Sequence, residues 1–217
     1  LDAHGDAPGL CLIVFEGRGR HFCFGASVEE HQADSAGAML DAFHGLFRKL
    51  GELSVPTAAV VRGQCLGGGL ELASYCSWIF SDARAHFGQP EIRLAVFPPM
   101  ASVLLPWRVG GAGALDLCVS GRSIDANEAR AMGLVSHVSE DPSAALDAFF
   151  LENISTSSAS SLRFAERAAR LSLTRALALD LPELERLYLD ELMKTDDANE
   201  GIAAFLEKRP PRYGGDR

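Results

Sequence analysis

Three consecutive glycines stand directly before an apolar run that contains one carboxylate, Glu71, in "GQCLGGGLEL", residues 63–72. A glycine-rich turn that opens a helix leaves backbone amides without acceptors at the positive end of the helix dipole. Because glycine has no side chain, a ligand can approach these amides closely, and they can bind an anion or a developing oxyanion. The segment has neither the Gly-Lys-Ser/Thr end of a P-loop nor a G-x-G-x-x-G pattern, and Glu71 would repel a phosphate. The segment therefore favours proton transfer beside an oxyanion.

A second carboxylate, Glu91, follows a proline in "FGQPEIRL", residues 87–94, with apolar runs on both sides. Two glutamates near one anion-stabilising turn can supply the acid and the base for a reaction with water. Both segments also have a purely structural interpretation. The glycines could let a helix pack closely on a strand, Glu71 could be a first-turn charge favoured by the dipole, and Glu91 could be a solvated loop charge.

A third segment, "RHFCFGAS" at residues 20–27, predicts a strand that runs into a turn of small residues. Such a turn could supply a second amide donor. The six histidines form no recognisable cluster, and we expect His21 and His86 to be structural. The five cysteines are scattered, without a C-x-x-C pair or zinc-ligand spacing, which predicts reduced thiols in the cytoplasm and no metal site.

The composition is that of a globular domain. The 217 residues are 47% hydrophobic and 23% charged, enough for one domain with a proper core and a small appendage. The net charge of −9 argues against a broad surface for nucleic acid, and no apolar run is long enough to span a membrane. Because the chain begins at Leu1 without a methionine, we expect that an N-terminal part is missing.

Strand and helix patterns alternate through the first two thirds of the chain. The uninterrupted apolar run at residues 10–15 predicts a strand buried on both faces. Further strands are predicted at residues 21–24, 57–61, 79–80 and 85–87, and helical segments at 38–50, 70–78 and from 98 to about 109. This alternation is typical of an α/β fold with short, buried strands.

Beyond about residue 141 the pattern becomes purely helical. Helices are predicted at residues 142–153, 159–173, 181–194 and 200–208. We therefore expect a core over residues 1–140 and a C-terminal helical oligomerisation region over residues 141–217.

Four segments resemble the crotonase superfamily, also called the enoyl-CoA hydratase/isomerase superfamily, in their order and spacing. They are "FCFGAS" (22–27), "GQCLGGGLELA" (63–73), "FGQPEIRL" (87–94) and "EGIAAFLEKRPP" (200–211), and the resemblance covers essentially the whole chain. It implies a ClpP-like spiral of ββα units capped by C-terminal helices and assembled as a trimer or a dimer of trimers. It also implies an acyl-CoA thioester as substrate, with no cofactor beyond the coenzyme A that the substrate carries.

The resemblance implies roles for four residues. The amides of Ala26 and Gly68 would form an oxyanion hole for the thioester carbonyl, where one donor is worth about 3 to 4 kcal/mol in the transition state. Glu91 would be the principal acid and base, and Glu71 would help to hold and activate water. Because both glutamates are present, the resemblance favours hydration over hydrolysis, decarboxylation or dehalogenation.

One departure from the family bears on the substrate. Where most family hydratases carry "PGAGG", this chain has Phe97-Pro98-Pro99-Met100, and Pro99 has no amide hydrogen to donate. This argues against an ordinary straight-chain enoyl-CoA. The segments at residues 24–31, 62–73 and 96–106 resemble one branch of the family, the cyclohexa-1,5-dienecarbonyl-CoA hydratases of anaerobic benzoyl-CoA degradation. Phe24, Phe97 and Met100 could line a wide pocket for a ring, although each could equally be a core residue.

Several further expectations concern the substrate. Ser27 stands where many relatives carry aspartate, so a charge at this position has no role here. Candidates for holding the phosphates of coenzyme A are Arg18, Arg20, Lys208 and Arg209. The full set of predicted substrate-binding residues is Phe24, Gly25, Gly67, Phe97, Pro99, Met100 and Lys208.

Four other functions remain open on the same scaffold. They are a generic enoyl-CoA hydratase/isomerase of fatty-acid oxidation, a double-bond isomerase, a ring-opening hydrolase, and a non-catalytic assembly or RNA-binding protein. The acidic net charge and the two glutamates argue against the last. We expect neither nucleic acid nor a membrane as a partner.

Overall fold

The computed structural model describes residues 1, 3, 5 and 7–214. Its larger sheet has four parallel strands in the order β1-β2-β4-β7. These strands are β1 (Ile13–Glu16), β2 (Thr57–Val61), β4 (Trp78–Ser81) and β7 (His137–Val138). Every residue of β2 is buried, because β2 lies between two other strands and carries only apolar or small side chains.

The smaller sheet brings the chemically interesting segments together. It contains β3 (Gln64–Leu66), β5 (His86–Gly88) and β6 (Ser123–Asp125), with β3 parallel and β6 antiparallel to β5. Cys23 makes an isolated parallel bridge with Cys65 of β3. The turn at residues 24–27 and the glycine turn that follows β3 therefore leave the sheet side by side.

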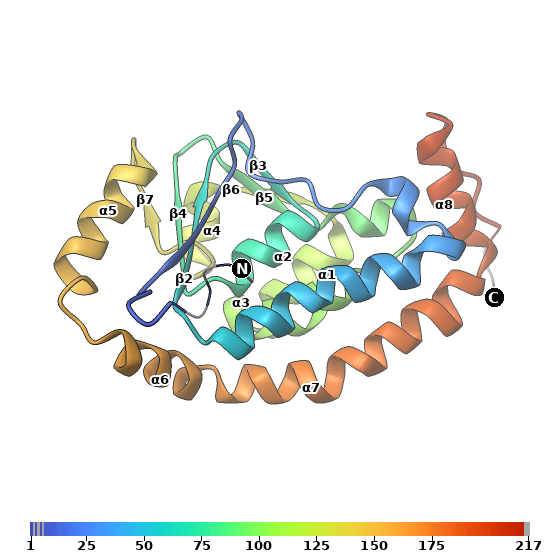
Figure 1. Cartoon of the computed structure of the whole chain (residues 1–217). Coiled ribbons are helices and arrows are strands. Elements are labelled where there is room, and N and C mark those ends of the chain that lie inside the picture. The colour runs from blue at the N-terminus through green and yellow to red at the C-terminus, as the bar shows by residue number, and fades with distance from the viewer. Residues whose placement is uncertain (2, 4, 6, 215–217) are drawn as a thin grey trace.

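Helices cover the sheets and build the rest of the molecule (Figure 1). The α-helices are α1 (Ala33–Leu53), α2 (Gly68–Tyr75), α3 (Pro99–Ser120), α4 (Ala126–Ala131), α5 (Pro142–Asn153), α6 (Ala159–Ala169), α7 (Leu171–Arg186) and α8 (Asp196–Leu206). Short 3₁₀ turns occur at η1 (Val28–His31), η2 (Pro90–Leu94) and η4 (Leu192–Lys194), and η3 (Leu187–Glu191) is a π turn. In Figure 1, α7 runs beneath α1 and α3 and connects α6, near the larger sheet, with α8 at the opposite end.

The start and end of α3 follow from its residue types. Pro99 occupies the first helical turn, where an amide would have no partner within the helix. Gly121 ends the helix in the left-handed conformation, with φ of 62°. Inside the helix, Met100 and Leu104 are fully buried against side chains of α1 and α7. This packing fixes the N-terminus of α3 beside α2.

The expected α/β alternation is confirmed, but several predicted elements need correction. The strand predicted at residues 10–15 is not buried on both faces: Val14 is 45% exposed because β1 is an edge strand of its sheet. The strand predicted at residues 21–24 is reduced to the single bridge at Cys23. The pattern also missed β6, α4 and β7, whose few apolar residues give no clear period.

The described chain is helical beyond β7, with ends that differ from the prediction. The helix predicted at residues 159–173 is divided at Arg170 into α6 and α7. The helix predicted at residues 181–194 has no separate start. Its first residues belong to α7, which continues through Pro182 to Arg186, and the π turn η3 follows. The helix predicted to reach residue 78 ends at Tyr75, because Trp78 begins β4.

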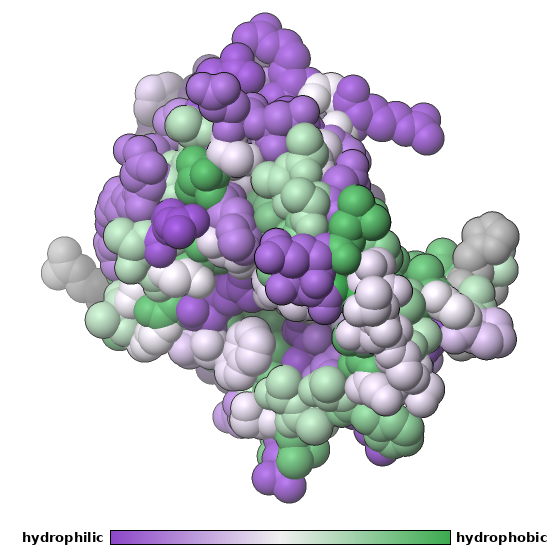
Figure 2. Space-filling model, turned by 90° about the vertical axis from the view of Figure 1, so that its left-hand side faces the viewer, coloured by the Kyte–Doolittle hydropathy of each residue, from purple (hydrophilic) through white to green (hydrophobic). Residues whose placement is uncertain are grey.

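Figure 2 shows the face formed by α5 and β7, the left side of Figure 1. Hydrophilic side chains gather at the top of this face, and less polar ones are more frequent in its lower half, where α6 and α7 lie in Figure 1. Within residues 7–214 and the other described positions, no helix is both long and apolar enough to cross a bilayer.

Candidate active site

Two cavities meet at the turns that leave the smaller sheet. The inner cavity has a volume of about 30 Å³ and the outer cavity about 510 Å³. Both are lined by Ala26, His31, Gly68 and Glu91, so these residues stand at the junction. The inner cavity has room for water, whereas the outer one can hold an extended organic molecule.

Two unpaired amides lie at this junction. Gly68 is the first residue of α2, and neither its amide nor that of Ala26 has an acceptor among the described residues. Gly25 brings the two turns into contact: it has φ of +91°, and a Cβ at this position would lie 2.6 Å from the Gly68 nitrogen. The sequence therefore needs glycine at position 25 to bring the Ala26 turn against the start of α2.

The other two glycines of the triplet also make close contacts. A Cβ on Gly67 would lie 2.7 Å from Oε1 of Glu91, and Gly67 has φ of +55°. A Cβ on Gly69 would lie 2.4 Å from the carbonyl oxygen of Cys23. The turn thus lies against a carboxylate on one side and the Cys23 backbone on the other. A residue with a side chain at position 67 or 69 would clash with one of them.

Glu71 projects from the first turn of α2 into the inner cavity and is only 6% exposed. Its Oε1 accepts a hydrogen bond of 2.7 Å from the amide of Ala101, in the first turn of α3. Pro99 lacks an amide hydrogen, as the sequence indicates, but the amide two residues later supplies a donor to Glu71. The positive end of α3 therefore partly offsets the cost of burying this carboxylate.

Glu91 lies in the first turn of η2 and borders both cavities. Its Oε2 is buried without a partner, and neither glutamate pairs with a cation in the described part of the chain. Burial raises the pKa of Glu91 to about 7. Burial, and then the charge of Glu91, raise the pKa of Glu71 to about 8 against the opposing Ala101 bond. Near neutral pH the pair therefore shares about one proton, so it offers one acid and one base.

The raised pKa values predict that the protein loses stability as the pH rises. The folded state holds protons more tightly than the unfolded chain, where a glutamate has a pKa near 4.5. The free energy of unfolding should be highest below that value, fall as the pH rises from there to about 7 to 8, and level off above. Urea unfolding at several pH values should show this slope in the wild type and in the exposed control Glu152→Gln, and a weaker slope in Glu71→Gln. A wild-type stability that does not change over this range would contradict the raised pKa values.

The predicted pocket residues lie in three different places. Phe97 and Pro99 line the inner cavity, whereas Phe24 and Gly67 line the outer one. Phe24 is 58% exposed, and Ser27 also lines the outer cavity. Met100 lines neither cavity, because its side chain is fully buried in the core between α1, α3 and α7, and we leave it out of the proposed site.

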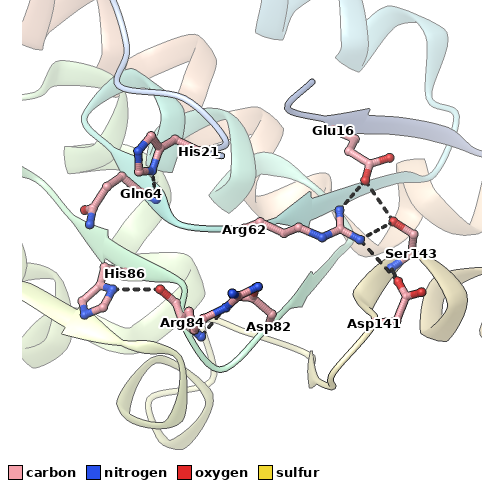
Figure 3. A network of polar contacts seen from close by, with 9 residues as sticks. All are labelled: Glu16, His21, Arg62, Gln64, Asp82, Arg84, His86, Asp141 and Ser143. Atoms are coloured by element: carbon pink, nitrogen blue, oxygen red, sulfur yellow. Dashed lines mark hydrogen bonds and ion pairs between the residues drawn. The ribbon is translucent and has the colours of Figure 1, made fainter. Parts of the chain in front are cut away.

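The two histidines expected to be structural make backbone contacts (Figure 3), and the ring of His21 also packs edge-on against Phe24 of the outer cavity, with 5.3 Å between the ring centres. The amide of Gln64 donates to Nδ1 of His21 over 3.1 Å, and Nδ1 of His86 lies 3.0 Å from the carbonyl oxygen of Arg84. Both residues line a third cavity of about 330 Å³ that shares no lining residue with the inner and outer cavities.

None of the four cations proposed from the sequence lines the outer cavity. Arg20 lines the third cavity, where Arg62 is paired with Glu16 at 2.5 Å and with Asp141 at 3.3 Å (Figure 3). Arg209 pairs with Glu200 and Glu207. Arg18 and Lys208 line neither the inner nor the outer cavity, although Lys208 follows α8.

Several residues at the cavities were missed by the sequence patterns, among them His31, which lines both, and the three that follow. Arg93 lines the outer cavity and makes no hydrogen bond or ion pair with the described residues. His44 and Tyr188 line the inner cavity. A signal for His44 was available, because it lies four residues after Leu40 on the buried face of a predicted helix. Tyr188 is presented by a π turn, which no simple periodicity reveals.

Within the described residues, no group of three or more His, Cys, Asp or Glu side chains is arranged to hold a metal ion. The candidate site therefore consists of two carboxylates with raised pKa values beside two unpaired amides. This arrangement can move protons next to a carbonyl oxygen that gains negative charge.

Comparison with known proteins places this geometry in context. The family described as enoyl-CoA hydratase/isomerase matches residues 3–216. The chain is 51% identical over 213 residues to the cyclohexa-1,5-dienecarbonyl-CoA hydratase of Thauera aromatica, covering 98% of this chain and 83% of that protein. It is 38% identical over 212 residues to a probable enoyl-CoA hydratase of Mycobacterium bovis, covering 96% and 82%. The crystal structure of a putative enoyl-CoA hydratase from Mycobacterium avium paratuberculosis superimposes with a TM-score of 0.87 at 26% identity, covering 99% and 84%.

Proposed function

Since the chain belongs to the enoyl-CoA hydratase/isomerase family, we propose that it adds water to a conjugated CoA thioester whose acyl group is a cyclic diene, in the degradation of aromatic acids. The observation that carries this proposal is the meeting of two proton-sharing glutamates with two unpaired amides at one junction. The 51% identity to a protein named for that substrate supports the choice of acyl group.

In this proposal the outer cavity binds the thioester and the inner cavity binds the water. The outer cavity is large enough for the arm of coenzyme A and the acyl group, while the inner cavity has room for water. The thioester carbonyl then lies at the junction, against the amides of Ala26 and Gly68. The reacting water lies on the other side, next to Glu71 and Glu91.

The chemistry follows from this placement. Glu91 takes a proton from the water as its oxygen bonds to a carbon of the conjugated system. The displaced electron pair moves to the thioester oxygen, where the amides of Ala26 and Gly68 stabilise the negative charge. When the carbonyl re-forms, carbon takes a proton from the acid form of the glutamate pair, and the pair returns to its starting proton count. Glu71 holds the water and shares the proton.

The inner cavity has no room for an acyl chain that extends past the junction. Met39, Leu40, Phe43, Phe97 and Tyr188 line the inner cavity and not the outer one. A long straight chain would have no space beyond the reacting carbons unless these side chains moved. The runner-up function, a generic enoyl-CoA hydratase/isomerase of fatty-acid oxidation, therefore has less support.

The test is turnover of three thioesters by the purified protein, followed by mass and absorbance: cyclohexa-1,5-dienecarbonyl-CoA, crotonyl-CoA and a long-chain enoyl-CoA. We expect the cyclic diene to react with the highest kcat/KM and the long chain with the lowest. A preference for the long chain would favour a generic enoyl-CoA hydratase/isomerase of fatty-acid oxidation instead. No turnover of any of the three would remove the hydratase assignment.

Arg93 is the cation that we propose for the anionic part of coenzyme A. Its guanidinium has no partner among the described residues and borders the outer cavity. Arg93→Ala should raise KM for the thioester about fivefold to tenfold with little change in kcat, because the contact is the same in the ground and transition states. Arg20→Ala, in the separate cavity, is the matched control and should change neither constant. A kcat effect without a KM effect would exclude this role for Arg93.

Assembly and location are part of the same proposal. Phe164 of α6, and Leu171 and Leu179 of α7, are exposed apolar side chains on the C-terminal helices. Such side chains favour a further subunit on this surface, in a trimer or a dimer of trimers. A cytoplasmic location fits the five cysteines, all of which are free thiols.

A further inference from the structure

Tyr188 is a polar residue of the inner cavity to which the proposed mechanism assigns no part. It lines the same cavity as Glu71 and Glu91, is 1% exposed, and its hydroxyl has no hydrogen-bond partner in the described part of the chain. A buried hydroxyl without a partner costs about 1 to 3 kcal/mol. A ligand that forms a hydrogen bond with this hydroxyl would remove that cost.

The position of the Tyr188 side chain is well defined. The π turn η3 presents it from the end of α7, and its ring packs edge-on against Phe97 with 5.5 Å between the ring centres. Burial, together with the charges of Glu91 and Glu71, raises the pKa of Tyr188. The hydroxyl therefore stays protonated and can donate.

The two histidines of this cavity each have one ring nitrogen engaged. Nδ1 of His44 lies 2.5 Å from Oε1 of Glu185, and Nδ1 of His31 lies 2.8 Å from the carbonyl oxygen of Ser27. Tyr188 differs from both because its only polar atom is unpartnered. Tyr188 lines this cavity together with the two glutamates, and the charges of both glutamates act on its hydroxyl, so a water held by the pair lies near that hydroxyl.

The reacting water needs such a donor. Its two hydrogens face the glutamates, which accept, and one lone pair attacks carbon. Its second lone pair is left for a hydrogen-bond donor. The ionised glutamate cannot provide one, and the proton of the acid form is the one delivered to carbon. We infer that the Tyr188 hydroxyl donates a hydrogen bond to the water oxygen that adds to the acyl group, and afterwards to the new hydroxyl of the product. This inference rests on the proposed hydratase function.

The first test is the steady-state kinetics and thermal stability of Tyr188→Phe. Removal of the donor should lower kcat about tenfold and leave KM for the unsaturated thioester within about twofold, because that substrate does not yet carry the oxygen. The melting temperature should stay equal or rise, since the variant buries a ring in place of an unpaired hydroxyl. Tyr75→Phe, in the core and away from both cavities, is the matched control with unchanged kinetics. An unchanged kcat, or a loss of activity that follows a lower melting temperature, would overturn the inference.

A binding measurement separates this inference from the function on which it rests. The probes are cyclohexanecarbonyl-CoA and 2-hydroxycyclohexanecarbonyl-CoA, compared by calorimetry in the wild type and in Tyr188→Phe. The variant should bind the hydroxylated ester about threefold to tenfold more weakly and the plain ester equally well. That result supports the Tyr188 contact even if the cyclic diene is not turned over. Equal weakening of both esters, no weakening of either, or no binding of either ester by the wild type would overturn it.

Discussion

Glu91→Gln should lower kcat for hydration by about a thousandfold, within the range of 10² to 10⁴ for loss of a general acid and base. Glutamine has nearly the same shape but can neither take a proton from water nor carry one to carbon. Binding of a saturated acyl-CoA should change little, because the thioester is held by backbone amides and by the outer cavity. Stopped-flow turnover and calorimetry on the same preparation measure the two effects separately.

A second glutamine variant serves as the control for Glu91. Glu152 is exposed on α5, far in the chain from the junction, and Glu152→Gln should retain wild-type kcat and KM. The assignment of Glu91 would fail if Glu91→Gln turned over substrate at a near-normal rate. It would also fail if the variant lost acyl-CoA binding in parallel with kcat, since that would make Glu91 a binding group.

Gly25→Ala should lower kcat nearly as much as Glu91→Gln, although it changes no side chain of the proposed acid and base. The added methyl group would lie 2.6 Å from the Gly68 nitrogen and would force apart the two turns that carry the unpaired amides. Loss of one oxyanion donor costs about a hundredfold to a thousandfold in kcat. Because Gly25 has φ of +91°, alanine would also be strained, so a lower melting temperature is expected as well.

The control for Gly25 is a glycine with space around it. A Cβ on Gly111, in α3, would have no atom within 4 Å, so Gly111→Ala should keep normal kinetics. To separate unfolding from loss of the oxyanion hole, kcat is measured well below the melting temperature of each variant. A folded Gly25→Ala protein with normal kcat would show that the amides of Ala26 and Gly68 do not act together.

The glycines and glutamates of the candidate site are predictable because their signals are local. A glycine triplet before an apolar helix indicates that the backbone amides there have no acceptor. Glu71 and Glu91 each lie within a single helical turn. The structure adds what each glycine approaches: Gly67 contacts Glu91, and Gly69 contacts the backbone of Cys23. These contacts join segments far apart in the chain, so no local pattern contains them.

The residues that complete the cavities could not be predicted for the same reason. Tyr188 reaches the inner cavity only because α7 folds back along α1 and α3 and then widens into a π turn. Met100 shows the opposite error: an apolar residue beside two prolines resembles a pocket residue, but tertiary packing buries it in the core. The exposed face of β1 was likewise unpredictable, since edge position depends on sheet order rather than on the apolar run itself.

The most direct test of the whole account is the fate of the water oxygen. The wild-type protein is incubated with cyclohexa-1,5-dienecarbonyl-CoA in water enriched in heavy oxygen, and the products are resolved by mass spectrometry. The account predicts a product that gains one heavy-oxygen water on the ring while the thioester stays intact. A product of unchanged mass would identify a double-bond isomerase, and heavy oxygen in a free carboxylate with release of coenzyme A would identify a hydrolase. Either result would contradict hydration by the Glu71 and Glu91 pair.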